Sequence, residues 1–504
     1  MYLTRINDSY TRVSGAEYEL NHVINTLRVY TPGAKFDPLV KMGLKSPYTS
    51  FVMRDGKDLI ILKGHEHMIK HLTTVYPESS EYALKTITGY LSEVIPSLPF
   101  KPYDYQVRCF IKCISEVKKI ALCCTGSGKS LVIALIADFF RSMGKRTLIL
   151  VPNINLLTQF ASDIKSYNLT KLANDMTILG DGQTPDLSKS LLISTWQSLV
   201  KHTDVLDKEP EWSFDCFIND ECHRNAGEVS STCASSLITT RYRFGFTGTI
   251  PEDPVLAYRL VGLFGKATRF ITAKELIKRG LGTPIKVVTT IFYYHGSMLH
   301  ALRDATQWNA QLKLLKEYAP RNEYIAKMAL ERMRANENTL VLFSHTEHGK
   351  ELYRTIMGIL EPKLAITNAN IVGKHSFAFQ SPHHVYFING EDDSATRELT
   401  RQILEHENGA ILVANYAILS TGVNIRKLHN LVLASPLKAY TTITQSLGRG
   451  IRKHDTKECF TVYDLVDNLT PVNLGGVFVR QYKHRVKTSY QPESYPITVT
   501  NANI

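Results

Sequence analysis

An apolar run, a glycine-containing loop and a second apolar run follow one another early in the chain. The run 120–123 is typical of a buried strand, and the run 131–140 is typical of a buried helix. Between them stands Cys123-Cys-Thr-Gly-Ser-Gly-Lys-Ser130. Gly-Lys-Ser strings occur by chance in ordinary turns, but a strand before the string and a helix after it are the context that phosphate binding requires. The sequence therefore predicts an α/β domain that binds a nucleotide.

The glycine-containing loop predicts most of a nucleotide site. Lys129 is expected to reach the outer phosphates of ATP, and the Ser130 hydroxyl is expected to bind Mg²⁺. The residues expected to contact the nucleotide are Thr125, Gly126, Ser127, Gly128, Lys129 and Ser130.

Two adjacent carboxylates follow the strand-like run 214–218. Asp220 is expected to hold the metal together with Ser130, and Glu221 is expected to orient and deprotonate the attacking water. A solvated surface acid is the alternative interpretation of Glu221.

Two arginines occur three residues apart near the C-terminal end of the chain. Arg449 and Arg452 suit one face of a helix, where they would neutralise charge on a transferring phosphoryl group. Gln445 precedes them and is expected to contact phosphate or water. Structural pairing with carboxylates is the alternative role of the arginines.

Length and charge restrict the class of protein. A chain of 504 residues predicts two to four domains, and a net charge of +12 favours a polyanionic partner. The start of the chain lacks the apolar core of a signal peptide, and no run has the length of a membrane span, so we expect a cytoplasmic protein without a membrane partner.

Metal binding by cysteine or histidine is not expected. The eight cysteines include no Cys-x-x-Cys pair, which predicts reduced and mostly buried thiols. His65-Glu-His-Met-Ile-Lys-His71 resembles a metalloprotease string, but Met68 stands where the glutamate is needed, so we expect an exposed polar helix.

Four segments are predicted along the chain. They are an N-terminal α/β domain (1–95) with a strand pair at 48–53 and 58–62, a first α/β domain (96–285), a second α/β domain (286–470) and a C-terminal tail (471–504). A charged helix at 273–280 is expected near the junction of the two larger domains. The strands predicted in these two domains are 120–123, 147–151, 191–194, 216–219, 242–246, 339–343, 384–388, 410–414, 431–434 and 460–464.

The order of short motifs over about residues 101–465 resembles superfamily 2 helicases. The strings that carry the resemblance are Tyr105-Gln106, Val151-Pro152, Ser194-Thr-Trp-Gln-Ser198, Thr247-Gly-Thr249, Phe343–Gly349, Ser420–Ile425 and Gln445–Arg452. The resemblance implies two RecA-like motor domains with ATP in the cleft between them. It also implies that Gln106 reads adenine and that Thr247-Gly-Thr249 couples hydrolysis to strand movement.

Within that superfamily, the chain is most similar to the UvsW-type phage helicases. The supporting strings are Phe36-Asp-Pro38, Asn219-Asp-Glu-Cys-His223 and Arg321–Lys327. The resemblance implies an ATP-dependent DNA helicase of the host cytoplasm that remodels branched or forked DNA in recombination, repair and replication, including branch migration. It also implies that the N-terminal module binds duplex or branched DNA.

Contacts to DNA are expected mainly at phosphate, through backbone N–H groups and the hydroxyls of Thr195 and Thr421. Trp196 is favoured as a core residue over a base-stacking one. Gly422 suits either close backbone approach or a plain turn.

The sequence leaves three alternative functions to consider. An RNA helicase is disfavoured because the chain carries Asp-Glu-Cys-His and Gln445 where DEAD-box relatives carry Asp-Glu-Ala-Asp and His. The motor subunit of a restriction system predicts a nuclease, yet Glu361-Pro-Lys363 has no plausible acidic partner upstream. A non-enzymatic DNA-binding scaffold is disfavoured because every reactive position is filled.

Overall fold

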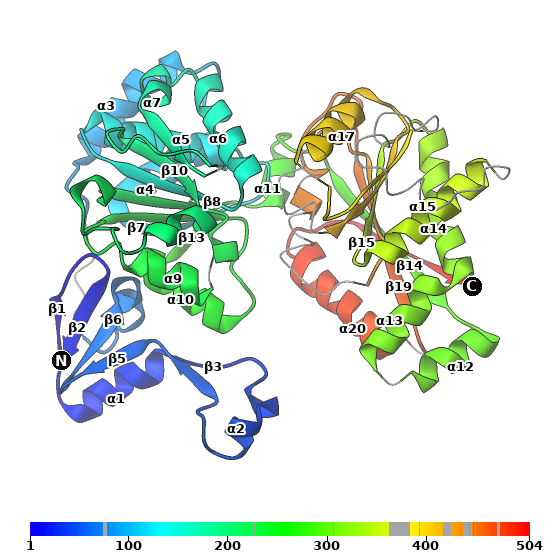
Figure 1. The fold of residues 1–504 in the computed structure, drawn as a ribbon, viewed down its shortest axis with the longest axis horizontal. Coiled ribbons are helices and arrows are strands. Elements are labelled where there is room, and N and C mark those ends of the chain that lie inside the picture. Colours follow the sequence, from blue (N-terminus) through cyan, green and yellow to red (C-terminus); the bar gives the residue numbers. More distant parts are fainter. Residues whose placement is uncertain are drawn as a thin grey trace. The chain divides into compact units, whose positions relative to one another are not determined.

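The structure is a computed structural model, and it describes residues 1–504 except 74–77, 181, 226, 306, 362–383, 393, 417–424, 437–442, 444–445, 449 and 471–473. The chain forms two compact units, Met1–Ile271 and Thr272–Ile504 (Figure 1).

The first unit begins with a small antiparallel sheet. Its strands run in the order β1-β2-β6-β5 and span Tyr2–Arg5, Tyr10–Ser14, Asp58–Leu62 and Val52–Asp55. Helix α1 (Glu17–Thr26) presents Leu20 and Val23 to the same core as Leu59 and Ile61. Alternate residues of β6 are buried, as one covered sheet face requires.

The predicted strand 48–53 is two strands. Its first part is β4 (Tyr48–Ser50), which pairs with β3 (Arg28–Tyr30), and its second part is β5, which pairs with β6 as predicted. The chain leaves the first ladder at Phe51, whose backbone N–H donates to Leu27 O at 2.9 Å. Between β3 and β4 lie a 3₁₀ turn, Ala34–Phe36, and the short helix α2 (Pro38–Lys41).

The exposed polar helix predicted around His65–His71 is wrong. The segment forms a 3₁₀ helix, Lys63–Met68, in which Lys63, Gly64 and His65 are buried. It packs on α10 (Pro254–Phe264), and a Cβ on Gly64 would lie 2.1 Å from Val261 O. Contact with a distant helix buries a segment whose local sequence is polar.

A parallel sheet forms the centre of the first unit. Among the described residues its seven strands run β13-β7-β12-β11-β8-β10-β9. They span Ala267–Ile271, Lys118–Cys123, Tyr242–Thr247, Cys216–Asp220, Thr147–Val151, Leu191–Thr195 and Met176–Leu179. The helices around it are α3 (Leu84–Val94), α4 (Asp104–Glu116), α5 (Lys129–Ser142), α6 (Ile154–Ser166), α7 (Thr170–Asn174), α8 (Trp196–Leu199), α9 (Glu228–Ser235) and α10.

The second unit repeats this architecture. The seven strands within its described part run β16-β17-β15-β18-β19-β14-β20, all parallel. They span Val385–Ile388, Ile411–Asn415, Thr339–Phe343, Asn430–Leu433, Phe460–Asn468, Ile285–Tyr293 and Ile497–Asn503. Its helices include α11 (Ala273–Lys278), α12 (Gly296–Asp304), α13 (Trp308–Glu317), α14 (Ala319–Arg334), α15 (Thr346–Leu360), α17 (Ser394–His406) and α20 (Gly476–Arg485).

The fold class predicted from the sequence is confirmed: two parallel α/β sheets and a small N-terminal α/β domain. The segment 471–504, which the sequence left without structure, contributes α20 and the edge strand β20. Seven of the eight cysteines are buried, as predicted. In the described part of the chain, no helix combines the length and hydropathy that crossing a bilayer requires.

Candidate nucleotide site

The glycine-containing loop connects β7 to α5, as the sequence predicted. Gly126 and Gly128 have φ of +83° and +75°, in the left-handed region that residues with a side chain rarely adopt. A Cβ on Gly128 would also lie 2.4 Å from Gln106 Nε2. The glycines therefore provide both the turn and the close approach of the loop to α4.

Two side chains of α4 bind the loop from behind. Gln106 Nε2 donates to Ser127 O at 3.0 Å and to Gly128 O at 3.2 Å, and the Tyr105 hydroxyl donates to Ser127 O at 2.8 Å. Gln106 Oε1 accepts from Tyr103 N at 2.8 Å at the start of α4. These carbonyl contacts hold the loop in shape, and adenine recognition by Gln106 stays a prediction.

Lys129 faces the carboxylate pair at the end of β11. Lys129 Nζ lies 2.5 Å from Glu221 Oε1 and 4.0 Å from Asp220 Oδ1, and all three side chains are largely buried. The sheet order makes this possible, because only β12 separates β7 from β11 and parallel strands end at one edge. The loop lysine and both acidic residues predicted from the sequence thus meet in one place.

Glu221 has an unusual backbone. Its φ of +48° is rare for a residue with a long side chain, and its N–H donates to Asp220 Oδ1 at 2.9 Å. Such strain persists only where surrounding contacts impose it, and it is concentrated at functional sites. The turn directs the two adjacent carboxylates toward the same ammonium group.

Burial and neighbouring charges shift the pKa values of Lys129 and Asp220 in opposite directions. Burial alone lowers the pKa of Lys129, but the carboxylates of Glu221 and Asp220 outweigh burial and raise that pKa above its usual value. Burial raises the pKa of Asp220, and Lys129 opposes that rise. A cation therefore stabilises the ionised carboxylate, which is the form that binds a metal ion.

His223 connects the acidic pair to a second motif. His223 Nδ1 lies 2.7 Å from Thr247 Oγ1, at the end of β12, and 3.4 Å from Glu221 Oε2. Thr247 Oγ1 in turn accepts from Thr249 N at 3.2 Å. Burial lowers the pKa of His223 to about 4, so the ring is neutral near pH 7. Hydrogen bonds thus connect His223 to Thr249, and the His223 ring also lies beside the Glu221 carboxylate.

The donor set fits Mg²⁺. The ion prefers oxygen ligands, takes one or two carboxylates and leaves room for water and phosphate. Asp220 offers a largely buried carboxylate, and Ser130 offers a hydroxyl in the first turn of α5. Across the residues with assigned positions, no three His, Cys, Asp or Glu side chains group as a metal site. Ser130 and Asp220 are the residues that would hold the ion.

Comparison with known proteins agrees with this geometry. The family described as "Type III restriction enzyme, res subunit" matches residues 99–252. The ATP-dependent DNA helicase uvsW of Enterobacteria phage T4 is 29% identical over 73% of this chain and 69% of its own length. The chain is thus similar to ATP-dependent DNA helicases of the UvsW type.

Two further proteins are similar to parts of this chain. The DNA 3'-5' translocase XPB2 of Sulfurisphaera tokodaii is 31% identical over 35% of this chain and 39% of its own length. The structure of a fragment of a putative HsdR subunit of a type I restriction enzyme from Vibrio vulnificus has a TM-score of 0.58 at 20% identity, covering 82% of this chain and 71% of that chain. At this low identity, the likeness to the HsdR fragment shows a shared fold only.

The structure also gives the positions of several other residues that the sequence predicted to be functional. Thr195 is buried at the end of β10, where its Oγ1 accepts from Ser198 N at 3.4 Å and caps α8. Trp196 belongs to the core of the first unit, as predicted. Arg452 lies in the second unit, where its carbonyl oxygen accepts from Thr283 Oγ1 at 3.1 Å. Thr421, Gly422, Gln445 and Arg449 lie outside the described residues.

Two contributions to the site were not predicted from the sequence. Tyr105 was noted only as part of a motif, yet its hydroxyl holds the phosphate loop. His223 was noted only as the last residue of Asp-Glu-Cys-His, yet it bonds to Thr247. The signal for the second was a histidine four residues after the predicted strand 216–219 and a threonine directly after the predicted strand 242–246.

Proposed function

We propose that this helicase hydrolyses ATP with Mg²⁺ to move along DNA and to remodel branched or forked DNA. The finer role is fork regression and branch migration in phage recombination, repair and replication, in the host cytoplasm. The observation that supports it best is the cluster of Lys129, Asp220 and Glu221 beside the glycine loop. Similarity to UvsW supports the choice of DNA.

In the proposed reaction, backbone N–H groups of the loop at Gly126 and Gly128 bind phosphate oxygens, and the Lys129 ammonium binds the outer phosphates. Ser130 and Asp220 would hold Mg²⁺, which would supply positive charge against the transferring phosphoryl group. Glu221 orients the attacking water and accepts its proton, because its carboxylate adjoins the proposed metal ligand Asp220.

We assign the neutralisation of transition-state charge to Arg449 and Arg452, with Gln445 bound to phosphate or water. Because these residues belong to the second motor domain, hydrolysis would require that domain to close on the first. Thr195 and Thr421 are proposed to contact DNA phosphate. Thr195 Oγ1 already caps α8, so its phosphate contact would use the hydroxyl proton.

The restriction-enzyme likenesses favour one other function, a translocating subunit of a restriction system. Such a subunit would support ATP-dependent DNA cleavage, whereas a branched-DNA helicase leaves the strands intact. An RNA helicase would instead be stimulated by RNA in preference to DNA.

One experiment separates these functions. Phosphate release by the full chain is measured with single-stranded DNA, RNA, and forked or four-way DNA, and the products are resolved on native and denaturing gels. We expect stimulation by DNA, displacement of strands from forks and four-way junctions, and intact strands on the denaturing gel. The variant E221Q is the control for activity from contaminants. Stimulation by RNA alone, or ATP-dependent strand cleavage, would contradict the proposal.

A further inference from the structure

The segment from the start of β3 to the end of β4 carries a group of exposed apolar side chains. We call residues 28–50 the arm, and Figure 1 shows β3 and α2 extending away from α1 and β5. Phe36, Met42 and Leu44 are 70%, 69% and 74% exposed, far more than folding alone favours. The exposed large apolar side chains of the arm are Tyr30, Phe36, Leu39, Met42, Leu44 and Tyr48. A concentration of this kind marks a binding surface.

The arm is ordered by its own contacts, so its tip is exposed in a defined shape. Thr31 N donates to Pro47 O at 2.8 Å, and Asp37 Oδ1 accepts from Leu39 N at 3.0 Å to cap α2. The Tyr30 and Tyr48 rings meet edge to face with centroids 5.7 Å apart. None of these contacts covers Phe36, Met42 or Leu44.

Basic residues alternate with the apolar ones. The arm contains Arg28, Lys35, Lys41 and Lys45 against the single acid Asp37, a net charge of +3. Lysine is depleted in the cores of protein–protein interfaces. Proteins that kink DNA, by contrast, combine an apolar wedge inserted between bases with Lys or Arg on phosphate. Charge complementarity thus favours a nucleic acid as the occupant.

The base of the arm is fixed to the first motor domain. Phe51, directly after β4, packs on Tyr258 of α10 with ring centroids 5.4 Å apart, and His65 Nε2 donates to Tyr258 O at 2.8 Å. Helix α10 begins at Pro254, five residues after Thr249 of the Thr247-Gly-Thr249 motif. The arm is therefore carried by a helix that follows the motif expected to couple hydrolysis to movement.

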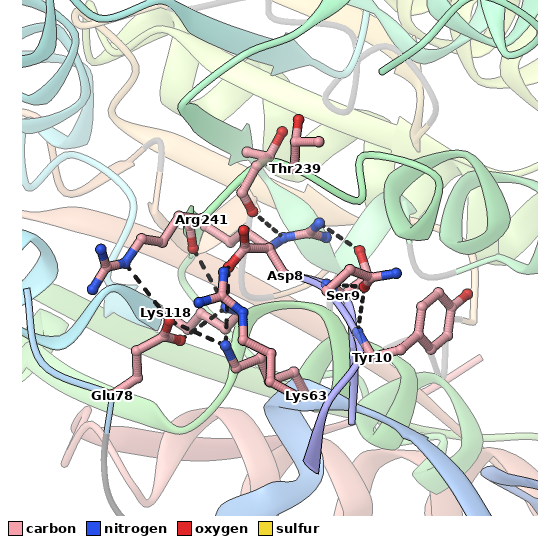
Figure 2. Close-up of polar contacts among 12 residues, drawn as sticks. Asp8, Ser9, Tyr10, Lys63, Glu78, Lys118, Thr239 and Arg241 are labelled. Carbon is pink, nitrogen blue, oxygen red and sulfur yellow. Dashed lines mark hydrogen bonds and ion pairs between the residues drawn. The ribbon is translucent and has the colours of Figure 1, made fainter. Parts of the chain in front are cut away.

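A buried polar network also attaches the N-terminal module to the first motor domain (Figure 2). Glu78 accepts from Lys63 at 3.1 Å and from Lys118 at 3.3 Å. Arg243, fully buried in β12, donates to Ser9 Oγ at 2.6 Å. These contacts join the N-terminal sheet to β7 and β12, so the module and the first motor domain move together.

We propose that the arm is a wedge for branched DNA. Phe36, Met42 and Leu44 insert against the terminal base pair at the junction, while Lys35 and Lys41 bind the flanking phosphates. The motor domain pulls a strand past a wedge attached to that same domain, so each step unstacks the next pair. This inference rests on the proposed function, because it needs a DNA substrate.

The test uses the full chain and forked DNA with 2-aminopurine in the junction base pair, whose fluorescence rises when the base unstacks. The wedge variant is F36A/M42A/L44A, and the phosphate variant is K35A/K41A. The matched control is Y18A, which removes an equally exposed apolar side chain (69%) from α1 of the same module. Because the substituted side chains are exposed, all variants should keep the melting temperature of the wild type.

We expect the wedge variant to lose the fluorescence rise and to remodel forks at least about tenfold more slowly, since one base–side chain stack is worth roughly that factor. Its ATPase stimulated by single-stranded DNA should stay within about twofold of wild type, because the arm is not part of the nucleotide site. K35A/K41A should weaken fork binding and lower its salt dependence by up to two phosphate contacts. Y18A should behave as wild type.

Three outcomes would overturn the wedge. An unchanged fluorescence rise in F36A/M42A/L44A with normal DNA-stimulated ATPase removes the wedge and leaves the proposed function intact. A wild type that self-associates through the arm in sedimentation, with a monomeric wedge variant that opens the junction normally, makes the arm a contact between two copies. Absence of DNA stimulation in the wild type itself removes the proposed function, and the wedge with it.

Discussion

Lys129 Nζ and Glu221 Oε1 lie 2.5 Å apart, so the residue expected to bind phosphate and the residue expected to activate water are paired with each other. Binding of a nucleotide to Lys129 must compete with this ion pair. The geometry therefore links phosphate binding to the release of the Glu221 carboxylate for its proposed role as a base.

The two partners should have separable roles. K129A should weaken ATP binding by roughly 10- to 100-fold, because it removes a charged hydrogen bond to phosphate and leaves two acids uncompensated. E221Q should keep ATP affinity and lower turnover by about 10²- to 10⁴-fold, the usual contribution of a general base. Titration with a fluorescent nucleotide and steady-state ATPase rates measure both. K112A on the exposed side of α4 is the control, and normal turnover by E221Q would exclude Glu221 as the base.

The bond between His223 and Thr247 should couple hydrolysis to strand movement. H223A and T247V each remove the 2.7 Å contact, so each should lower the DNA strands displaced per ATP hydrolysed. The double variant should be no worse than the poorer single variant, with a coupling energy of about 0.5–3 kcal/mol. ATPase and strand-displacement rates, measured in parallel, give that ratio. Additive losses would mean that the two residues act independently.

His65 should make the first unit sensitive to acid. Burial lowers its pKa from 6.5 to about 4, so the unfolded chain binds the proton more readily than the folded chain between these values. Stability is thus complete above about pH 6.5 and falls as the pH drops toward 4, by on the order of 3 kcal/mol. Urea unfolding at pH 7.5, 6 and 5 should show a smaller pH dependence in H65Q than in the wild type. Equal pH dependence in both proteins would assign the acid sensitivity to other groups.

Glu78 should be essential for the attachment of the N-terminal module. Lys63 and Lys118 are only 8% and 9% exposed, and E78Q would remove the carboxylate that they share, which leaves Lys63 with only the more distant carboxylate of Asp8 at 3.9 Å. We expect a loss of about 3 kcal/mol in the free energy of unfolding, as for other broken buried pairs. Thermal or urea unfolding monitors the loss. E17Q, which breaks an exposed pair with Arg54, should leave the midpoint unchanged, and equal midpoints for both variants would show that the network stabilises nothing.

Much of the fold was predictable because buried parallel strands are continuous apolar runs. Thr147–Val151 and Leu191–Thr195 are buried along their whole length, and both were identified from the sequence. Edge strands lack this signal, because one side of each strand faces no neighbouring strand. Strand β20 (Ile497–Asn503) is polar and largely exposed, and only its pairing with β14 makes it a strand.

The sequence by itself determined the types of reactive group and their order along the chain: a phosphate loop, an acidic pair and a later pair of arginines. Local spacing carries that information because a loop or strand end presents its own residues in a set order. Only the tertiary structure decided which distant groups meet. Gln106 binds the loop, His223 bonds to Thr247, and α10 buries His65, because each depends on contact between segments that no local pattern connects.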